Sequence, residues 1–299
     1  MNIKTNYCLA VMLCGCLLGS RNCGAADPPA TADSSALVSA LQEVTVQCGS
    51  LRVSLPAPTL PPGLPAAQRA AALKQAAGKY SLDRWTRDSI VAPFVFDKTT
   101  LKDESGRRVG YQLDLWFIAY GDLATVEERG LFADMLGADA DDDDAGGPLT
   151  EAELAAREIQ LPAGNAVARQ LVHFSVPVMK RVQVAGVVRT ESLRGDDFLL
   201  GFSRIDERFN QDKQYANRWW SLDEDGDSGE DEAEPYSGFA GYAIATSLEE
   251  PSGALLIECH AVIHEPHGWF DGRSLLSSKL PLLVQDNVRQ FRRALGKAK

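Results

Sequence analysis

The sequence predicts an α+β fold in which an antiparallel β-sheet of six or more strands packs on a long C-terminal α-helix. Three observations predict this fold. Residues 241–264 have the pattern of a hairpin, with two β-prone runs around a turn that contains Pro and Gly. Two earlier regions, 91–120 and 170–206, carry further strand-like runs. Residues 274–295 place apolar side chains at steps of three to five, which is the spacing of one helical face.

The N-terminal 26 residues are typical of an export signal. Lys4 lies in a short positive head, an apolar core runs from Tyr7 to Leu18, and small residues lead up to Ala26. A core of about a dozen residues is too short to span a bilayer, and no later stretch is long enough. A cut after Ala26 therefore predicts a periplasmic or secreted protein with no transmembrane segment. The residues before Cys16 also resemble a lipoprotein cleavage box, so a form lipidated at Cys16 is the alternative.

The remaining chain divides by composition. Residues 27–36 are rich in Ala, Pro, Asp and Ser and are expected to be a disordered tether. Residues 37–299 are expected to be a single α+β domain, and two sheet-based subdomains divided near residue 145 are the alternative. The net charge is −11, but the acidic residues concentrate in two expected loops, 137–147 and 222–235. The nearly neutral remainder argues against a nucleic-acid-binding protein, which needs a basic face.

The first part of the domain is expected to hold short strands at 44–46 and 51–55, followed by an extended loop. Residues 56–65 contain several prolines, which block both helix propagation and central strand pairing. Pro65 suits the first position of an alanine-rich helix that ends near Gly78.

The middle of the domain is expected to alternate between strands and short helices. Strands at 91–96 and 110–120 flank a charged turn and predict a long hairpin. Thr150 and Glu153 have the spacing of a capping box, which predicts a helix at 149–159. A further helix is expected at 126–136, and further strands at 170–178, 181–192 and 197–206.

The last strand and the last helix are predicted in most detail. Along 254–264 the odd-numbered residues are apolar, and Glu258 and His260 lie on the other face, so one face is expected to be buried and the other mostly solvated. Ser277 or Ser278 caps the start of the C-terminal helix in this interpretation. Pro281 is then placed in the first turn, where its missing N–H costs little.

The second acidic loop matches part of the calcium-loop template, which needs oxygen ligands with a glycine between them. The first position is Ser221 and no helix pattern precedes it, so a solvated acidic insertion is the favoured interpretation. The candidate calcium ligands are Asp223, Asp225, Asp227 and Glu232.

The histidines offer a weaker metal candidate. His260 and His264 lie about 13 Å apart along one strand, too far to hold one ion together. His264 and His267 with a nearby glutamate are the remaining zinc alternative, and histidines at a strand edge are the favoured interpretation.

Catalytic motifs do not appear in the sequence. It contains no nucleophile elbow, phosphate loop, dinucleotide fingerprint or zinc-protease helix, so no catalytic residue and no cofactor are predicted. Cys48 and Cys259 are the cysteines clearly outside the signal region, and whether they pair stays open.

Aromatic and apolar residues of the sheet and the C-terminal helix are mostly expected to form a core, and a subset is the candidate lining of an apolar cavity. The candidate ligand-binding residues are Trp116, Phe198, Phe202, Tyr242, Trp269, Leu276, Leu280 and Val284.

A family resemblance supports that choice. The strand 254–264, the break Glu265-Pro-His-Gly-Trp269 and the amphipathic helix 274–295 together resemble the C-terminus of START-type, helix-grip lipid-binding domains. The resemblance implies a curved antiparallel sheet that wraps the final helix, with a hydrophobic ligand between them. It covers only the C-terminal part of the chain, and the acidic insertions depart from it.

The leading hypothesis is an exported, non-catalytic binding protein that holds a lipid-like ligand between the sheet and the C-terminal helix. One alternative is an enzyme of unrecognised type, such as a hydrolase. Another is an envelope-associated interaction protein whose acidic loops meet calcium or a basic partner.

Overall fold

The structure is a computed structural model, and it describes residues 41, 44–61, 63–132, 146–161, 167–223, 229–236 and 238–296. The predicted export signal, including Cys16, and the predicted tether lie outside these residues. So do residues 137–145 of the first acidic loop and 224–228 of the second.

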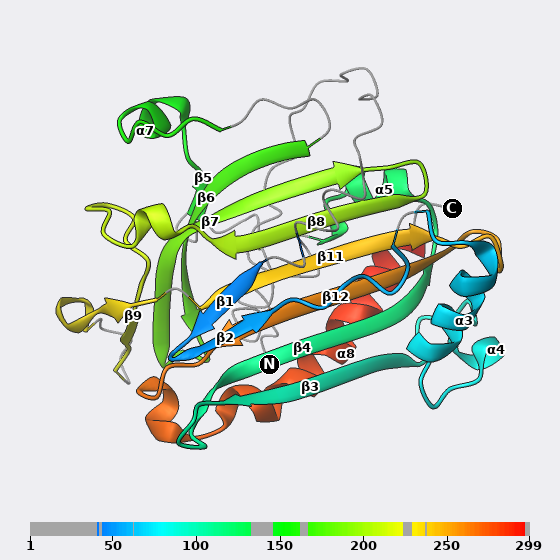
Figure 1. Cartoon of the computed structure of the whole chain (residues 1–299), viewed down its shortest axis with the longest axis horizontal. Coiled ribbons are helices and arrows are strands. Elements are labelled where there is room, and N and C mark those ends of the chain that lie inside the picture. The colour runs from blue at the N-terminus through cyan, green and yellow to red at the C-terminus, as the bar shows by residue number, and fades with distance from the viewer. Residues whose placement is uncertain are drawn as a thin grey trace.

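Within the described residues the strands form a ten-stranded antiparallel sheet, and the predicted α+β fold is confirmed (Figure 1). The strands are β3 Phe94–Lys102, β4 Arg108–Tyr120, β5 Gly146–Pro148, β6 Val167–Val178, β7 Val182–Arg194, β8 Phe198–Ile205, β9 Arg218–Ser221, β10 Glu234–Pro235, β11 Phe239–Ser247 and β12 Ala254–His264. The order is β10-β9-β7-β8-β11-β12-β4-β3, with β6 on the other edge of β7 and β5 beside β6. Strands from both sides of residue 145 therefore share one sheet.

The sheet divides at Gly186 in the middle of β7. Val182–Ala185 pairs with β9, whereas Val188–Arg194 pairs with β8. Asn217 lies in the fork between β8 and β9, where its Oδ1 accepts a hydrogen bond from Val187 N at 2.9 Å. A Cβ on Gly186 would lie 2.4 Å from that oxygen, so the fork requires glycine at this position. The division lets β9 turn away from β8.

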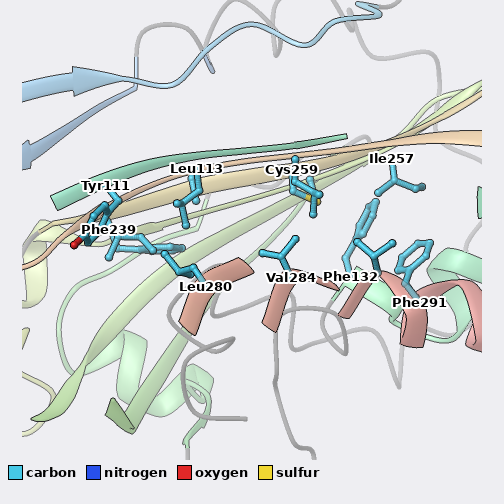
Figure 2. Close-up of a cluster of buried hydrophobic side chains, with 14 of the residues drawn as sticks. Tyr111, Leu113, Phe132, Phe239, Ile257, Cys259, Leu280, Val284 and Phe291 are labelled. Carbon is cyan, nitrogen blue, oxygen red and sulfur yellow. The ribbon is translucent and has the colours of Figure 1, made fainter. Parts of the chain in front are cut away.

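One helix, α8 (Leu275–Gly296), packs on the inner face of the sheet (Figure 1). Figure 2 shows Leu280, Val284 and Phe291 pointing from α8 toward the side chains of the strands. The Phe291 ring meets the Phe117 ring edge-on, with centroids 5.4 Å apart. We call this contact region the sheet–helix core. Its buried members include Tyr111, Leu113, Leu115, Phe117, Ala119, Ile257, Cys259, Ile263, Trp269, Leu276, Leu280, Val284, Val288, Phe291 and Leu295.

The predicted place of Pro281 in the first helical turn is wrong. The helix already begins at Leu275, so Pro281 lies inside it and has no N–H for the carbonyl of Ser277, four residues earlier. Lys98 of β3 supplies a donor instead, with its Nζ 3.1 Å from Ser277 O. Lys98 also donates to the Ser277 hydroxyl. A contact from another element thus compensates for the proline.

The outer face of β12 is covered, which corrects the expectation of a mostly solvated face. Every residue from Ala254 to Ile263 is buried. The cover comes from the N-terminal part of the domain, and β1 and β2 lie in front of the sheet in Figure 1. Its elements are β1 Thr45–Cys48, β2 Leu51–Ser54, α3 Ala66–Ala76 and α4 Leu82–Trp85. We call the apolar contacts beneath β1 and β2 the outer cluster; it includes Val46, Cys48, Leu55, Phe198, Phe202, Tyr242, Ile244 and Val262.

The two cysteines lie on opposite faces of the sheet and do not form a disulfide with each other. Cys48 belongs to the outer cluster and Cys259 to the sheet–helix core. Burial raises the pKa of the Cys48 thiol to about 12. The chain also forms two short helices, α5 (Leu123–Glu128) and α7 (Glu151–Ala155), and the predicted capping box of Thr150 and Glu153 is present at α7.

Candidate functional site

The eight predicted ligand-binding residues do not lie in one place. Trp269, Leu276, Leu280 and Val284 lie in the sheet–helix core, whereas Phe198, Phe202 and Tyr242 lie in the outer cluster. Trp116 lies on the outer side as well, packed against the cluster beneath α3 and α4. The structure therefore brings Trp269, Leu276, Leu280 and Val284 together and places the other four predicted residues on the opposite face of the sheet. The alternation of side chains along β4 could have predicted the position of Trp116. Its side chain points to the opposite face of the sheet from that of Phe117, the next residue.

An aromatic cluster closes the end of the sheet–helix core where α8 begins. The Tyr236 ring stacks on Trp269 at 5.7 Å and on His264 at 6.1 Å, and Trp219 meets Trp269 at 6.1 Å. Trp269 is fully buried, and its Nε1 has no hydrogen-bond partner among the described residues. Burial lowers the pKa of His264 to about 4, so its imidazole is neutral at neutral pH. This end is therefore densely packed with rings, and charged groups adjoin it, since Arg108 and Glu265 form an ion pair there and Lys98 contacts Ser277.

A cleft of about 520 Å³ lies at the opposite end, where α8 finishes beside the end of β4. β3 stops pairing with β4 at Phe117, which leaves the last three residues of β4 beyond its reach. The last turn of α8 packs close to the end of β4, since a Cβ on Gly121 would lie 2.5 Å from Leu295 Cγ. The cleft is lined by Asp88, Ser89, Ile90, Ile118, Ala119, Tyr120, Arg292, Arg293 and Gly296. Ala119 also belongs to the sheet–helix core, so the cleft reaches that core.

A buried polar cluster lies on the outer face around His260. Its Nδ1 is 2.7 Å from Asp114 Oδ1, and its Nε2 is 3.6 Å from Glu258 Oε2. Burial disfavours the imidazolium, but the two carboxylates outweigh burial and raise the pKa of His260 above its ordinary value.

This cluster holds the cover in place. Glu258 is fully buried and accepts hydrogen bonds from Thr59 N at 2.8 Å and from Trp116 Nε1 at 3.2 Å. Its other oxygen accepts from Leu60 N at 3.4 Å. Because the carboxylate and the imidazole are enclosed, the arrangement fixes residues 59–60 to the sheet and leaves no open face for a substrate.

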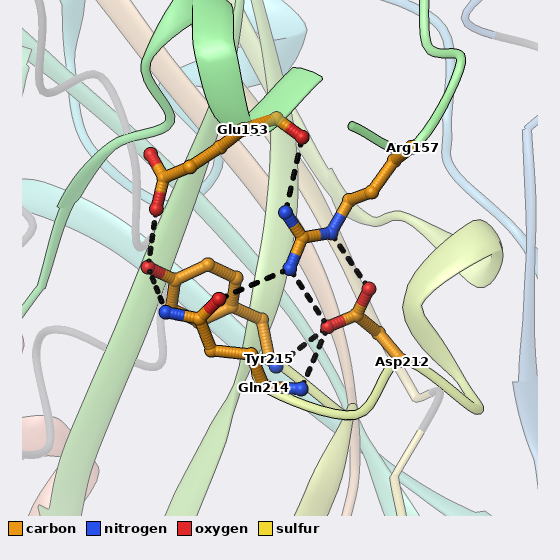
Figure 3. A network of polar contacts seen from close by, with 5 residues as sticks. All are labelled: Glu153, Arg157, Asp212, Gln214 and Tyr215. Atoms are coloured by element: carbon orange, nitrogen blue, oxygen red, sulfur yellow. Dashed lines mark hydrogen bonds and ion pairs between the residues drawn. The ribbon is translucent and has the colours of Figure 1, made fainter. Parts of the chain in front are cut away.

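A second polar network joins α7 to the turn after β8 (Figure 3). Arg157 donates to Asp212 with Nε–Oδ2 and Nη2–Oδ1 distances of 2.7 and 3.1 Å. Glu153 accepts from the Tyr215 hydroxyl at 2.6 Å, and this bond and the bonds from Thr150 lower the pKa of Glu153 to about 2. Each charged group in Figure 3 is thus paired with a neighbour in the network, which indicates a structural role.

A smaller cleft of about 270 Å³ lies between β1 and the strands β7 and β8. Three arginines line it, at positions 189, 204 and 208. Two of them are ion-paired, because Arg208 donates to both oxygens of Asp206 at 2.8 and 2.6 Å and Arg189 pairs with Glu191.

The calcium prediction finds no support. Asp225 and Asp227 lie outside the described residues, and Glu232 is exposed in a short 3₁₀ turn that spans Glu230–Glu232. Among the residues that the structure describes, no three His, Cys, Asp or Glu side chains converge on one point as metal ligands would. Within the same residues, no helix is long and apolar enough to cross a membrane.

Three solved structures are similar to this chain at TM-scores under 0.5 and identities under 15%. No protein-family model and no curated protein matches the sequence. Among solved structures, the human StarD13 (DLC2) lipid transfer and protein localization domain is similar with a TM-score of 0.38 and 10% identity, over 68% of this chain and 89% of that chain. A putative uncharacterized protein from Rhizobium leguminosarum has a TM-score of 0.29 and 9% identity, over 68% and 99% of the two chains. The di-domain ARO/CYC StfQ from the steffimycin biosynthetic pathway has a TM-score of 0.23 and 14% identity, over 64% and 72%.

Proposed function

We propose that the protein binds an apolar small molecule of the lipid class, without catalysing a reaction, between the inner face of the sheet and α8. The ligand enters through the 520 Å³ cleft at the C-terminal end of the helix. One observation carries the proposal: the cleft is walled in part by Ala119, which belongs to the sheet–helix core. A ligand in the cleft therefore borders the sheet–helix core at this residue.

The size and chemistry of the cleft support this function. Small-molecule sites usually enclose about 300–1,000 Å³ and combine apolar walls with a few polar groups. Ile90, Ile118 and Ala119 supply apolar surface here. The charged side chains are those of Asp88 and of Arg292 and Arg293 in the last turn of α8.

The inner face of the sheet is broad and apolar. A helix is about 10 Å across and neighbouring strands are about 4.8 Å apart, so one helix covers roughly two strands. Apolar inner residues continue onto more distant strands, with Val172 on β6 and Val184 on β7 both fully buried. The apolar face is therefore wider than α8 alone.

The site of action is proposed from the sequence. The N-terminal 26 residues have the pattern of an export signal, and we propose that the protein works in the periplasm or outside the cell. Lipidation at Cys16 is the anchored alternative.

Native mass spectrometry of the purified protein, followed by calorimetric titration with 1-decanol and decanoate, tests the proposal. We expect bound lipid that is lost on denaturation, and saturable binding of at least one of the two probes. Gly296→Trp is the informative variant, because Gly296 lines the cleft and a Cβ there meets no atom within 4 Å. The added ring should fill the cleft and weaken binding at least about fivefold. Lys279→Trp, on an exposed position near the start of the same helix, is the matched control.

Two results would contradict the proposal. One is a bare chain mass together with no binding of either probe. The other is equal weakening of binding by Gly296→Trp and Lys279→Trp, which would place the ligand away from the cleft.

A further inference from the structure

Arg292 is the most unusual group in the cleft, because it is a buried cation held by carbonyl oxygens. The residue is 7% exposed. Its Nε donates to Ile118 O at 2.8 Å, on the end of β4. Its Nη1 donates to Ala92 O at 2.6 Å and Ile90 O at 3.3 Å, and its Nη2 to Pro93 O at 3.1 Å. The guanidinium thereby joins the loop before β3 to the edge of β4.

These contacts give Arg292 no negatively charged partner, and its guanidinium lies over the Phe117 ring with Cζ 5.5 Å from the ring centroid. Within the described part of the chain, no carboxylate lies within ion-pair distance of its guanidinium, and burial lowers its pKa to about 10. Buried charges in proteins are normally paired with an opposite charge, since an unpaired one is costly. One of the five guanidinium hydrogens, on Nη2, is also left over after the four carbonyl contacts.

The charges around the cleft do not cancel. Arg292 and Arg293 line it together with one acid, Asp88, and no ion pair joins Asp88 to either arginine among the described contacts. Two cations and one carboxylate leave one positive charge in excess. Ile90, Ile118 and Ala119 lie in the same cleft, so the excess charge adjoins apolar surface.

We propose that the ligand is an amphipathic monoanion, such as a fatty acid, whose anionic group binds at Arg292 and Arg293 while its apolar chain extends past Ala119. This inference rests on the proposed function and specifies its ligand class. A carboxylate accepts strong hydrogen bonds from guanidinium groups, and one negative charge neutralises the excess in the cleft. The Asp88 carboxylate disfavours a dianion in the same place.

Calorimetric titration of the full chain with three ten-carbon probes tests the inference. Decanoate, 1-decanol and decyltrimethylammonium share the apolar chain and differ in head-group charge. We expect decanoate to bind at least about tenfold more tightly than decanol, because hydrogen bonds between charged groups exceed those between neutral ones. Decyltrimethylammonium should bind no more tightly than decanol.

Variants of α8 assign the preference to the cleft. Arg293→Gln removes an exposed cleft cation and should reduce the ratio of decanoate affinity to decanol affinity several-fold. Arg292→Gln, checked for cooperative unfolding, should reduce the ratio further. Arg289→Gln is the matched control, because Arg289 lies one turn earlier, pairs with Asp286 at 3.8 Å and does not line the cleft.

The outcomes separate the two proposals. Equal affinities for decanoate and decanol would overturn the anionic ligand and leave the apolar binding function standing. A preference that survives Arg293→Gln unchanged, or that Arg289→Gln removes equally, would also overturn it. Failure of all three probes to bind would overturn the proposed function itself.

Discussion

The link between Lys98 and the proline inside α8 makes a prediction that a double-mutant cycle can measure. Pro281 leaves the Ser277 carbonyl without its helical donor, and Lys98 Nζ supplies one at 3.1 Å. Lys98→Met keeps most of the side-chain length and removes the donor. Pro281→Ala restores the helical N–H to the same carbonyl. The two substitutions should therefore not be additive.

The expected magnitudes follow from the contacts. A hydrogen bond from a charged donor contributes about 1.5–3 kcal/mol, and the half-buried position of Lys98 reduces this to about 1–2 kcal/mol. Proline inside a helix is about 3 kcal/mol less favourable than alanine, offset by about 0.4–1 kcal/mol of unfolded-state entropy. With adaptation of the surroundings, Pro281→Ala should stabilise by about 1–2 kcal/mol. In that background Lys98→Met should cost about 1 kcal/mol less than in the wild type.

Urea unfolding followed by tryptophan fluorescence gives the free energy of unfolding for the four proteins of the cycle. Lys279→Met, at an exposed position on the same helix, is the control and should change the free energy by less than about 0.5 kcal/mol. If Lys98→Met costs the same with proline and with alanine at position 281, the ammonium does not replace the missing donor, and the reasoning is refuted.

Two histidines should give opposite pH dependences of stability. The pKa of His264 is lowered by burial to about 4, so the wild type should lose on the order of 2 kcal/mol relative to His264→Phe as pH falls from 7 to 4; parallel curves would contradict this. The pKa of His260 is raised, since the carboxylates of Asp114 and Glu258 outweigh burial. The stability of the wild type relative to His260→Gln should therefore be greatest below about pH 6.5 and decline as pH rises through the folded pKa, and an increase with pH would contradict it. Urea unfolding across pH measures both.

Local patterns in the sequence were sufficient to predict the hairpin of β11 and β12 and the helix α8. Strand alternation and helical spacing are properties of neighbouring residues, and they survive in the folded chain. The start of α8 was misplaced because proline is most common in a first helical turn. The donor that tolerates Pro281 comes from Lys98, on a strand far away in the sequence, and no local rule includes such a contact.

The outer face of β12 shows why polar residues misled the burial prediction. Glu258 and His260 alternate with apolar residues as they would on a half-solvated strand. In the structure their charges are met by each other, by Asp114 and by backbone N–H groups of residues 59 and 60. A polar residue is buried when its partners are present, and those partners come from elements that the alternation does not describe.

The helical spacing in the sequence is sufficient to predict the burial of one cleft residue, Arg292. Arg292 lies four residues after Val288 and three before Leu295, which places it on the buried helical face. That position distinguishes it from Arg293, which is exposed. Three of the carbonyl groups that accept hydrogen bonds from it belong to the loop before β3 and the fourth to Ile118 on β4, and no local pattern predicts these contacts.

The two ends of the sheet–helix core differ in a way that sets the orientation of a bound ligand. The end where α8 begins is filled by Tyr236, Trp269 and the neutral His264. The end where α8 finishes carries the buried guanidinium of Arg292 and the cleft. An amphipathic anion bound in the cleft would place its charge at Arg292 and Arg293 and its apolar chain against the sheet–helix core. Under the proposal the head group therefore stays at Arg292, and the chain lies along α8 toward Val284.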